Sequence, residues 1–101
     1  MNKVFISGMI MGNPELRMEQ GENAHLVLNL SVRHKTKDGE IRKEIYRVSA
    51  WHNTAKWGAE NLAGGQIVAV QGYLTQRSIR ADGMTAVATE IAVEEFFPMN
   101  R

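Results

Sequence analysis

The sequence predicts a small all-β protein. Two observations support this prediction, the alternating pattern of the central stretch and the length of the chain. From residue 24 onward apolar and polar side chains alternate, which is the pattern of a strand with one buried face. The apolar parity consists of Leu26, Leu28, Leu30 and Val32. The chain then reaches Asp38-Gly39, a pair that supplies the positive backbone angles of a tight hairpin turn, and returns as a second strand over residues 41 to 51. With 101 residues, 44% of them hydrophobic, the chain can bury one modest core, so residues 1 to 101 are expected to form a single domain.

The first strand is expected to begin almost at the N-terminus, with Val4 and Ile6 on its inner parity. Gly8 predicts a bend or bulge within it. Gly12-Asn13-Pro14 predicts a break, after which extended structure resumes before a turn at residues 20 to 23. The outward parity is also apolar and consists of Phe5, Met9 and Met11. Either the chain itself or a second subunit must cover this face.

A change of period after residue 52 predicts one short helix. Its apolar residues recur at helical spacing as Ala55, Ala59 and Leu62. Asn53 or Thr54 is expected to cap its N-terminus, and Gly64-Gly65 to end it. Residues 66 to 77 and 85 to 96 then alternate as two further strands, which a second Asp-Gly turn at Asp82-Gly83 joins.

The predicted order is therefore three strands, one short helix and two strands. Five strands with a helix between the third and the fourth match the five-stranded Greek-key barrel called the OB-fold. In that fold the face around strands 2 and 3, with its flanking loops, binds oligonucleotides or oligosaccharides. Trp57, on the helix, is expected to cover the end of the barrel or a partner. The fold prediction thus directs attention to the central hairpin.

The central hairpin is also the basic part of the chain. Residues 33 to 47 carry a charge of +3, while the remainder carries −2 and the whole chain +1. Cations spread along a line, with aromatic side chains between them, suit the phosphates and bases of a single nucleic-acid strand. The competing interpretation is that these lysines and arginines keep an exposed strand pair soluble and protect its edges from aggregation.

Composition excludes several other classes of protein. The chain has no cysteine, which excludes a disulfide scaffold and cysteine-based zinc sites. His25, His34 and His52 lack the spacing of metal ligands and are interpreted as incidental, so neither a metal nor a cofactor is expected. The N-terminus lacks the apolar region of a signal peptide, and no apolar run approaches the roughly 18 residues of a membrane span. The expected location is the cytoplasm, with no membrane partner.

Several short runs recur along the chain at characteristic spacing. In chain order they are Met1-Asn2-Lys3-Val4 with Ile6-x-Gly8, Asn13-Pro14-Glu15-Leu16-Arg17, Tyr46-Arg47-Val48-x-x-Trp51, the helix over residues 55 to 62, Gly65-x-x-Val68-x-Val70-x-Gly72-x-Leu74-x-x-Arg77 and Thr89-Glu90-Ile91. Together these runs resemble the bacterial single-stranded DNA-binding proteins, and the resemblance covers nearly the whole chain at the spacing of the family. It implies a nucleoid-associated protein, not an enzyme, that binds single-stranded DNA in replication, recombination or repair and assembles as a homotetramer or homodimer.

Ten residues are predicted to bind the DNA: Arg33, Lys35, Lys37, Arg42, Lys43, Arg47, Trp51, Tyr73, Arg77 and Arg80. The cations would neutralise phosphates. Trp51 shares its strand parity with Arg47, so it is expected to face an outer groove and stack on bases, and Tyr73 is a second candidate for stacking. The family's other stacking aromatics fall at Thr36, Ile45 and Ile79, none of which is aromatic here. We therefore expect weaker binding, because each stacked base contributes about 1–3 kcal/mol.

Two other functions compete with DNA coating. The sequence ends without the flexible linker and acidic tip by which the family recruits other replication proteins. It is therefore either a piece of a longer chain or a short member that coats DNA without recruiting. A dimeric replication-restart adaptor of the primosomal protein N type resembles the same OB-fold, and the missing stacking aromatics favour it. A small nuclease is disfavoured, because the sequence shows no clustered carboxylates, nucleophile or metal-ligand set.

Overall fold

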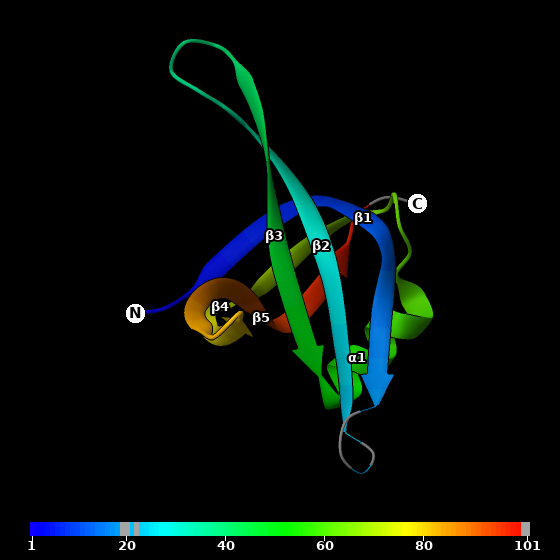
Figure 1. Cartoon of the computed structure of the whole chain (residues 1–101). Helices are drawn as coiled ribbons and strands as arrows, with labels where there is room; N and C mark the ends of the chain where they lie inside the picture. Colours follow the sequence, from blue (N-terminus) through cyan, green and yellow to red (C-terminus); the bar gives the residue numbers. More distant parts are fainter. Residues whose placement is uncertain (19–20, 22, 100–101) are drawn as a thin grey trace.

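The computed structural model describes residues 1 to 18, 21 and 23 to 99, so the turn expected at residues 20 to 23 falls largely outside it. Within these ranges there are five strands and one helix: β1 (Val4–Met18), β2 (Ala24–Lys35), β3 (Ile41–Trp51), α1 (His52–Asn61), β4 (Ile67–Ala81) and β5 (Met84–Pro98). The strands close into a barrel in the order β1-β2-β3-β5-β4 (Figure 1). All paired strands are antiparallel except β3 and β5, which are parallel. The predicted OB-fold is therefore confirmed.

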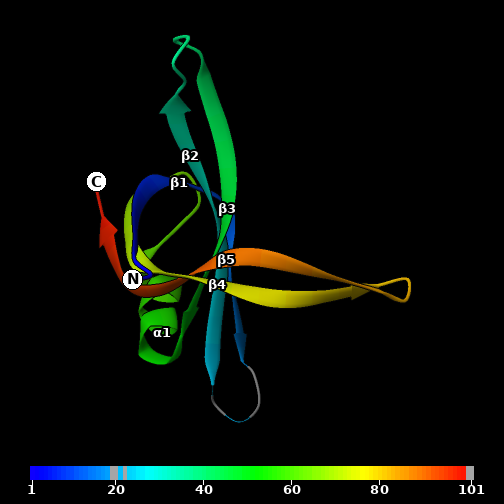
Figure 2. The same cartoon turned by 90° about the vertical axis from the view of Figure 1, so that its left-hand side faces the viewer.

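The inward parity of each strand fills the barrel with aliphatic side chains. Leu26 and Leu30 of β2, Ile10 of β1, Val48 of β3 and Val70 of β4 are all fully buried in one cluster. The apolar parity that the alternation predicted thus corresponds to the barrel interior. The outer parity is not uniformly exposed as a half-buried strand requires, because His25, Val27 and Ser31 are buried as well. Helix α1 lies across one end of the barrel (Figure 2), where Ala55, Leu62 and the β5 residue Phe96 close the core.

Strand β1 runs without the break predicted at Gly12-Asn13-Pro14. It instead contains a register shift between Met11 and Glu15, and Gly12 has a φ of 67°, which favours glycine. The shift has a structural reason, because β1 has two neighbours. Its first half pairs with β4 and its second half with β2, so the strand must bend where it changes partner.

Of the bend or bulge predicted at Gly8, the bulge is wrong, because Gly8 pairs in regular register with Val68. Glycine is needed there for a different reason. A Cβ atom at Gly8 would overlap the carbonyl oxygen of Ser31 on β2. The same constraint holds for Gly72, whose Cβ would overlap the carbonyl oxygen of Ala92. Both glycines allow neighbouring backbones to approach closely.

Helix α1 begins earlier and ends earlier than predicted. Trp51 occupies the N-cap position in extended conformation and makes no side-chain capping hydrogen bond, so the expected caps at Asn53 or Thr54 are wrong. His52, with a φ of 56°, makes the turn from β3 directly into the helix. The helix ends at Asn61 rather than at the glycine pair, because Leu62 turns to extended conformation and is buried in the core.

Two hairpins extend beyond the barrel in different directions (Figure 2). The β4–β5 hairpin has the predicted two-residue turn, with Asp82 and Gly83 both at positive φ, and its strands are longer than predicted. The β2–β3 hairpin does not turn at two residues. Lys35 pairs with Ile41, which leaves residues 36 to 40 as a loop that Thr36 and Glu40 close through their backbones.

Candidate nucleic-acid interface

The outer surface of β1, β2 and β3 carries a row of side chains that includes Trp51. Backbone register aligns Arg17 of β1 with His25 of β2, and His25 with Trp51 of β3. Trp51 is 44% exposed, while the neighbouring residues Ala50 and Leu26 point into the core. The indole therefore faces outward, as the strand parity predicted, and Arg17 extends the row onto β1.

Trp51 does not stand alone on this surface, because His25 lies flat against it. The two ring centroids are 3.7 Å apart and the ring planes differ by 3°. His25 is 8% exposed, and its Nε2 atom lies 3.3 Å from the hydroxyl oxygen of Ser49, which is also buried. The sequence pattern predicts an incidental role for His25, whereas in the structure His25 backs the predicted stacking residue.

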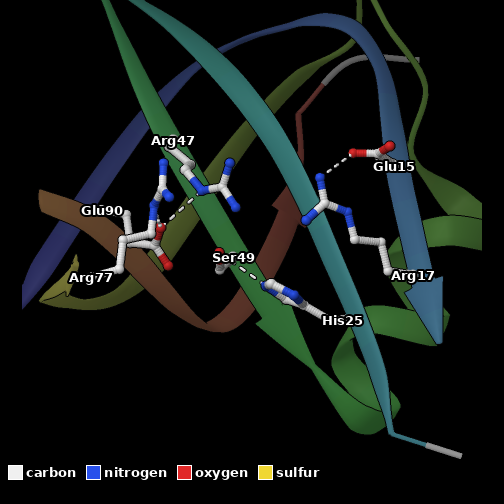
Figure 3. A network of polar contacts seen from close by, with 7 residues as sticks. All are labelled: Glu15, Arg17, His25, Arg47, Ser49, Arg77 and Glu90. Atoms are coloured by element: carbon white, nitrogen blue, oxygen red, sulfur yellow. Dashed lines mark hydrogen bonds and ion pairs between the residues drawn. The ribbon is translucent and has the colours of Figure 1, made fainter. Parts of the chain in front are cut away.

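A second cluster joins three strands a short way along the same surface (Figure 3). Arg47 of β3 donates a hydrogen bond from Nε to Oε1 of Glu90 on β5, at 2.9 Å. Nε of Arg77, on β4, lies 2.9 Å from the same oxygen in an ion pair that lacks hydrogen-bond geometry. Glu90 is 8% exposed. Two arginines that the sequence predicts to bind phosphates thus share one buried carboxylate, and the sequence pattern does not point to that carboxylate as part of the site.

Most cations of the β2–β3 hairpin lie on the face that carries Trp51. Lys43 and Arg47 point to the same side of β3 as Trp51. Arg33 and Lys35 of β2 lie directly opposite β3 residues that point to that side. Arg33 and Lys43 pair with each other and line a hollow of about 350 Å³ that Ser7 and Met9 of β1 complete. The basic face therefore continues from the hairpin to the barrel wall.

The structure does not bring every predicted cation to this face. Arg42 pairs with His34 on the opposite side of the β2–β3 hairpin, and Lys37 lies in its terminal loop. Arg80 is near the tip of the β4–β5 hairpin, where its parity is opposite to that of Arg77. These three residues are therefore peripheral to the row that contains Trp51.

The three positions at which the family resemblance implies further aromatics, residues 36, 45 and 79, are occupied in two different ways. Ile45 and Ile79 are exposed and share the parity of Arg47 and Arg77, respectively. Thr36 closes the hairpin loop, because its hydroxyl oxygen accepts a hydrogen bond from the backbone N–H of Glu40 at 3.2 Å. Tyr73 is exposed on β4 with the parity of Arg77. Two aliphatic side chains and one tyrosine thus accompany Trp51.

The opposite side of the β2–β3 hairpin carries a small polar network. The Tyr46 hydroxyl donates to Oε1 of Glu44 at 2.8 Å, and Nε2 of His34 lies 3.4 Å from the same oxygen. The hydrogen bond from Tyr46, followed by the contact with His34, holds the pKa of Glu44 below its ordinary value. The same hydrogen bond raises the pKa of Tyr46 above its ordinary 10.0. This network stabilises the hairpin rather than lining the row with Trp51.

Other kinds of site receive no support in the described part of the chain. Over residues 1 to 18, 21 and 23 to 99, no three His, Cys, Asp or Glu side chains gather as metal ligands. In the same residues no helix is long and apolar enough to cross a membrane. A hollow of about 480 Å³ lies beside α1, lined by Trp57, Phe96, Glu94 and Glu95, but it is apart from the basic face.

Fold and surface together define a class of protein. A closed five-stranded barrel whose β2–β3 region carries cations and an exposed indole is an OB-fold of the kind that binds oligonucleotides. Residues 1–99 match the family model described as the single-strand binding protein family. The chain belongs to this family, whose members are non-enzymatic DNA-binding proteins.

Individual relatives are similar over most of this chain. Single-stranded DNA-binding protein 3 of Clostridium acetobutylicum is 31% identical over 99 residues, which cover 94% of this chain and 68% of that protein. The single-stranded DNA-binding protein of Malacoplasma penetrans is 29% identical over 101 residues and is covered for 52% of its length. A crystal structure of a deletion mutant of the single-stranded DNA binding protein from Thermus aquaticus superposes with a TM-score of 0.79 at 27% identity. The superposition covers 99% of this chain and 51% of the Thermus aquaticus chain.

Proposed function

We propose that this chain binds single-stranded DNA with little sequence preference, in replication, recombination or repair. The strand would follow the outer face of β2 and β3, from the hairpin cations past Arg47 to Trp51. The observation that carries the proposal is the exposed indole of Trp51, backed by His25, on the same face as those cations. Family membership supports it, and we place the activity in the cytoplasm on nucleoid DNA.

Within this function the two kinds of side chain have different tasks. Arg33, Lys35, Lys43, Arg47 and Arg77 neutralise phosphates, and Lys37, Arg42 and Arg80 add to the positive potential at the periphery. Trp51 and Tyr73 stack on bases. Stacking tolerates any sequence because every base has a π-face, whereas phosphate neutralisation releases counterions and makes the affinity fall with salt. Aliphatic residues at positions 45 and 79 lower the affinity relative to a fully aromatic surface.

We also propose that the chain assembles with itself, as a dimer or tetramer, through the outer face of β1. Phe5 is 71% exposed, and Met9 and Met11 beside it are exposed as well. Phe5 contacts Phe97 edge to face with centroids 6.1 Å apart, which enlarges the apolar area. A second copy would remove this surface from water.

The replication-restart adaptor is the alternative function. The aliphatic side chains of Ile45 and Ile79 and the large apolar face on β1 favour it, because an adaptor depends more on protein contacts than on base stacking. The family match and the names of the relatives favour DNA binding by the chain itself.

A fluorescence titration separates the two functions. The variant Trp57→Phe leaves Trp51 as the remaining indole of the chain and keeps an aromatic ring against Phe96. Added oligothymidylate should quench Trp51 in a saturable manner at low salt, and the affinity should fall at higher salt. A self-associated protein that shows no quenching at low salt would support the adaptor and refute the proposed DNA site.

A further inference from the structure

We propose that Glu90 is a positioning residue that combines Arg47 and Arg77 into one subsite for a single phosphodiester group. This inference rests on the proposed DNA-binding function and assigns a specific part of that site. It concerns a residue that would be expected to weaken DNA binding, because a carboxylate next to the path of a polyanion is repulsive.

The geometry of the cluster carries the inference (Figure 3). The Nε atoms of Arg47 and Arg77 both lie 2.9 Å from the same oxygen of Glu90, so they cannot be further apart than twice that distance. The two arginines come from β3 and β4, and Glu90 comes from β5. The carboxylate contacts each guanidinium at Nε, and the two terminal nitrogens of each arginine are the donors that would meet the phosphate.

Burial explains why the carboxylate can orient both groups. The Glu90 side chain is 9% exposed, whereas those of Arg47 and Arg77 are 27% and 40% exposed. The carboxylate is therefore the fixed member, and the guanidiniums project from it toward solvent. Without a carboxylate between them, two guanidiniums this close would repel each other and turn apart. With it, the cluster keeps a net charge of +1 and a fixed pair of planar donors, which suits the bidentate recognition of a phosphate.

The position of the cluster agrees with the proposed path of the strand. Glu90 pairs in register with Thr75, which is two residues from Tyr73 and two from Arg77 on the same face of β4. Arg47 is on the face of β3 that carries Trp51. The subsite thus lies on the same face as both proposed stacking side chains, four residues before Trp51 on β3 and beside Tyr73 on β4, where a phosphate next to a stacked nucleotide would pass.

The substitution Glu90→Gln tests the inference by the sign of its effect. It removes one negative charge from the surface with almost no change in side-chain volume. If Glu90 merely opposes DNA, the variant binds oligothymidylate more tightly and its affinity falls more steeply with salt. If Glu90 positions the arginines, the variant binds about tenfold more weakly. The slope of log affinity against log salt should then also become shallower by about one phosphate contact.

The matched control is Glu94→Gln, which makes the same change of charge at an exposed site on β5 away from the two arginines. It should leave the affinity unchanged or slightly raise it. Thermal unfolding of both variants reports whether the barrel is intact, and the salt slope of the folded protein is a readout that a purely structural loss would not move. A Glu90→Gln variant that binds as tightly as the wild type, or more tightly, overturns the inference.

A second variant covers the case in which Glu90→Gln does not fold. Arg47→Lys combined with Arg77→Lys keeps Glu90 and both charges but removes the planar donors. It should bind about tenfold more weakly than the wild type, whereas Lys56→Arg, an exchange between the same two cations at an exposed position of α1, should bind normally. Equal binding by the double variant overturns the inference. A wild-type protein that fails to bind at low salt refutes the proposed function itself, so the two failures are distinguishable.

Discussion

At the scale of single residues, the pairing of His25 with Trp51 is the least expected feature of the site. An exposed tryptophan normally loses side-chain freedom when a base stacks on it, and that entropy opposes binding. Here the indole already rests on a nearly parallel imidazole ring that is buried and adjacent to Ser49. The outer face of the indole is thus held ready for a base.

Trp51→Ala tests the stacking role. The substitution should weaken binding to oligothymidylate by about 1–3 kcal/mol, because one base loses the aromatic ring on which it stacks. Fluorescence anisotropy of a labelled oligonucleotide measures it without any protein signal. Trp57→Phe is the control and should bind normally, since Trp57 packs against Phe96 beside the helix. An unchanged affinity for Trp51→Ala would remove this residue from the site.

His25→Ala tests the backing role. An aromatic pair contributes about 0.5–1.5 kcal/mol of stabilising free energy beyond the effect of the area it buries. The alanine variant should therefore lose binding free energy of that order. His25→Phe restores a flat ring and should recover most of the loss. The same anisotropy assay measures both variants. The backing role is contradicted if the phenylalanine variant binds no better than the alanine variant.

At the scale of elements, alternation predicted the faces correctly but could not give the register of the central hairpin. A two-residue turn at Asp38-Gly39 would place Trp51 opposite Leu26, which is a core residue. The loop over residues 36 to 40 moves the pairing by one position and places Trp51 opposite His25. Since a shift by one residue exchanges the two faces of a strand, the partner of Trp51 depends on loop geometry rather than on strand pattern.

The same limit explains why Glu90 was not assigned to the site. The order of elements and the alternation of β4 and β5 were sufficient to predict the barrel and to place Arg77 on the outer parity. The contact among Arg47, Arg77 and Glu90 requires the crossover that sets β5 beside both β3 and β4. Such non-local pairing leaves no periodic signal in the sequence. Similarly, Gly8 stands out in the sequence, but the close backbone approach at Gly8 and at Gly72 depends on strand pairing that the sequence does not show.

The polar network on the reverse side of the β2–β3 hairpin gives a pH-dependent prediction. Glu44→Gln should return the pKa of Tyr46 toward 10.0, because the hydrogen bond to the carboxylate is what raises it. An NMR titration of the Tyr46 ring carbon measures the change. Because the pKa of Tyr46 is raised, its hydrogen bond to Glu44 stabilises the folded protein below about pH 10, and this stabilisation is lost as the pH rises through the raised pKa. For Glu44, whose pKa is lowered, it is present above the ordinary value of 4.5 and is lost as the pH falls. A Tyr46 titration that is identical in both proteins would contradict the network.

At the scale of the whole molecule, the outer face of β1 distinguishes an isolated barrel from an assembly. A domain of this size has little chain with which to cover exposed aromatic and methionine side chains. The described structure leaves Phe5, Met9 and Met11 exposed, next to the hollow that Arg33 and Lys43 line. A partner subunit on this face would therefore lie close to the DNA path and could lengthen it.

Phe5→Glu tests the assembly. A charged side chain in the middle of the apolar face should reduce the molar mass measured by light scattering from that of a dimer or tetramer to that of the monomer. Met84→Glu is the control, because Met84 is equally apolar and exposed but lies at the β4–β5 turn. It should leave the mass unchanged. A wild-type protein that is already monomeric at micromolar concentrations would refute the proposed self-association.

The double pairing of β1 has a consequence for the order of events during synthesis. The β2–β3 hairpin joins residues that are near in sequence, so it can form as soon as residue 51 has left the ribosome. The pairing of β1 with β4 joins Val4 to Gly72, so it cannot form until β4 has also been synthesised. A nascent chain would therefore expose the cations of the β2–β3 hairpin before the barrel closes.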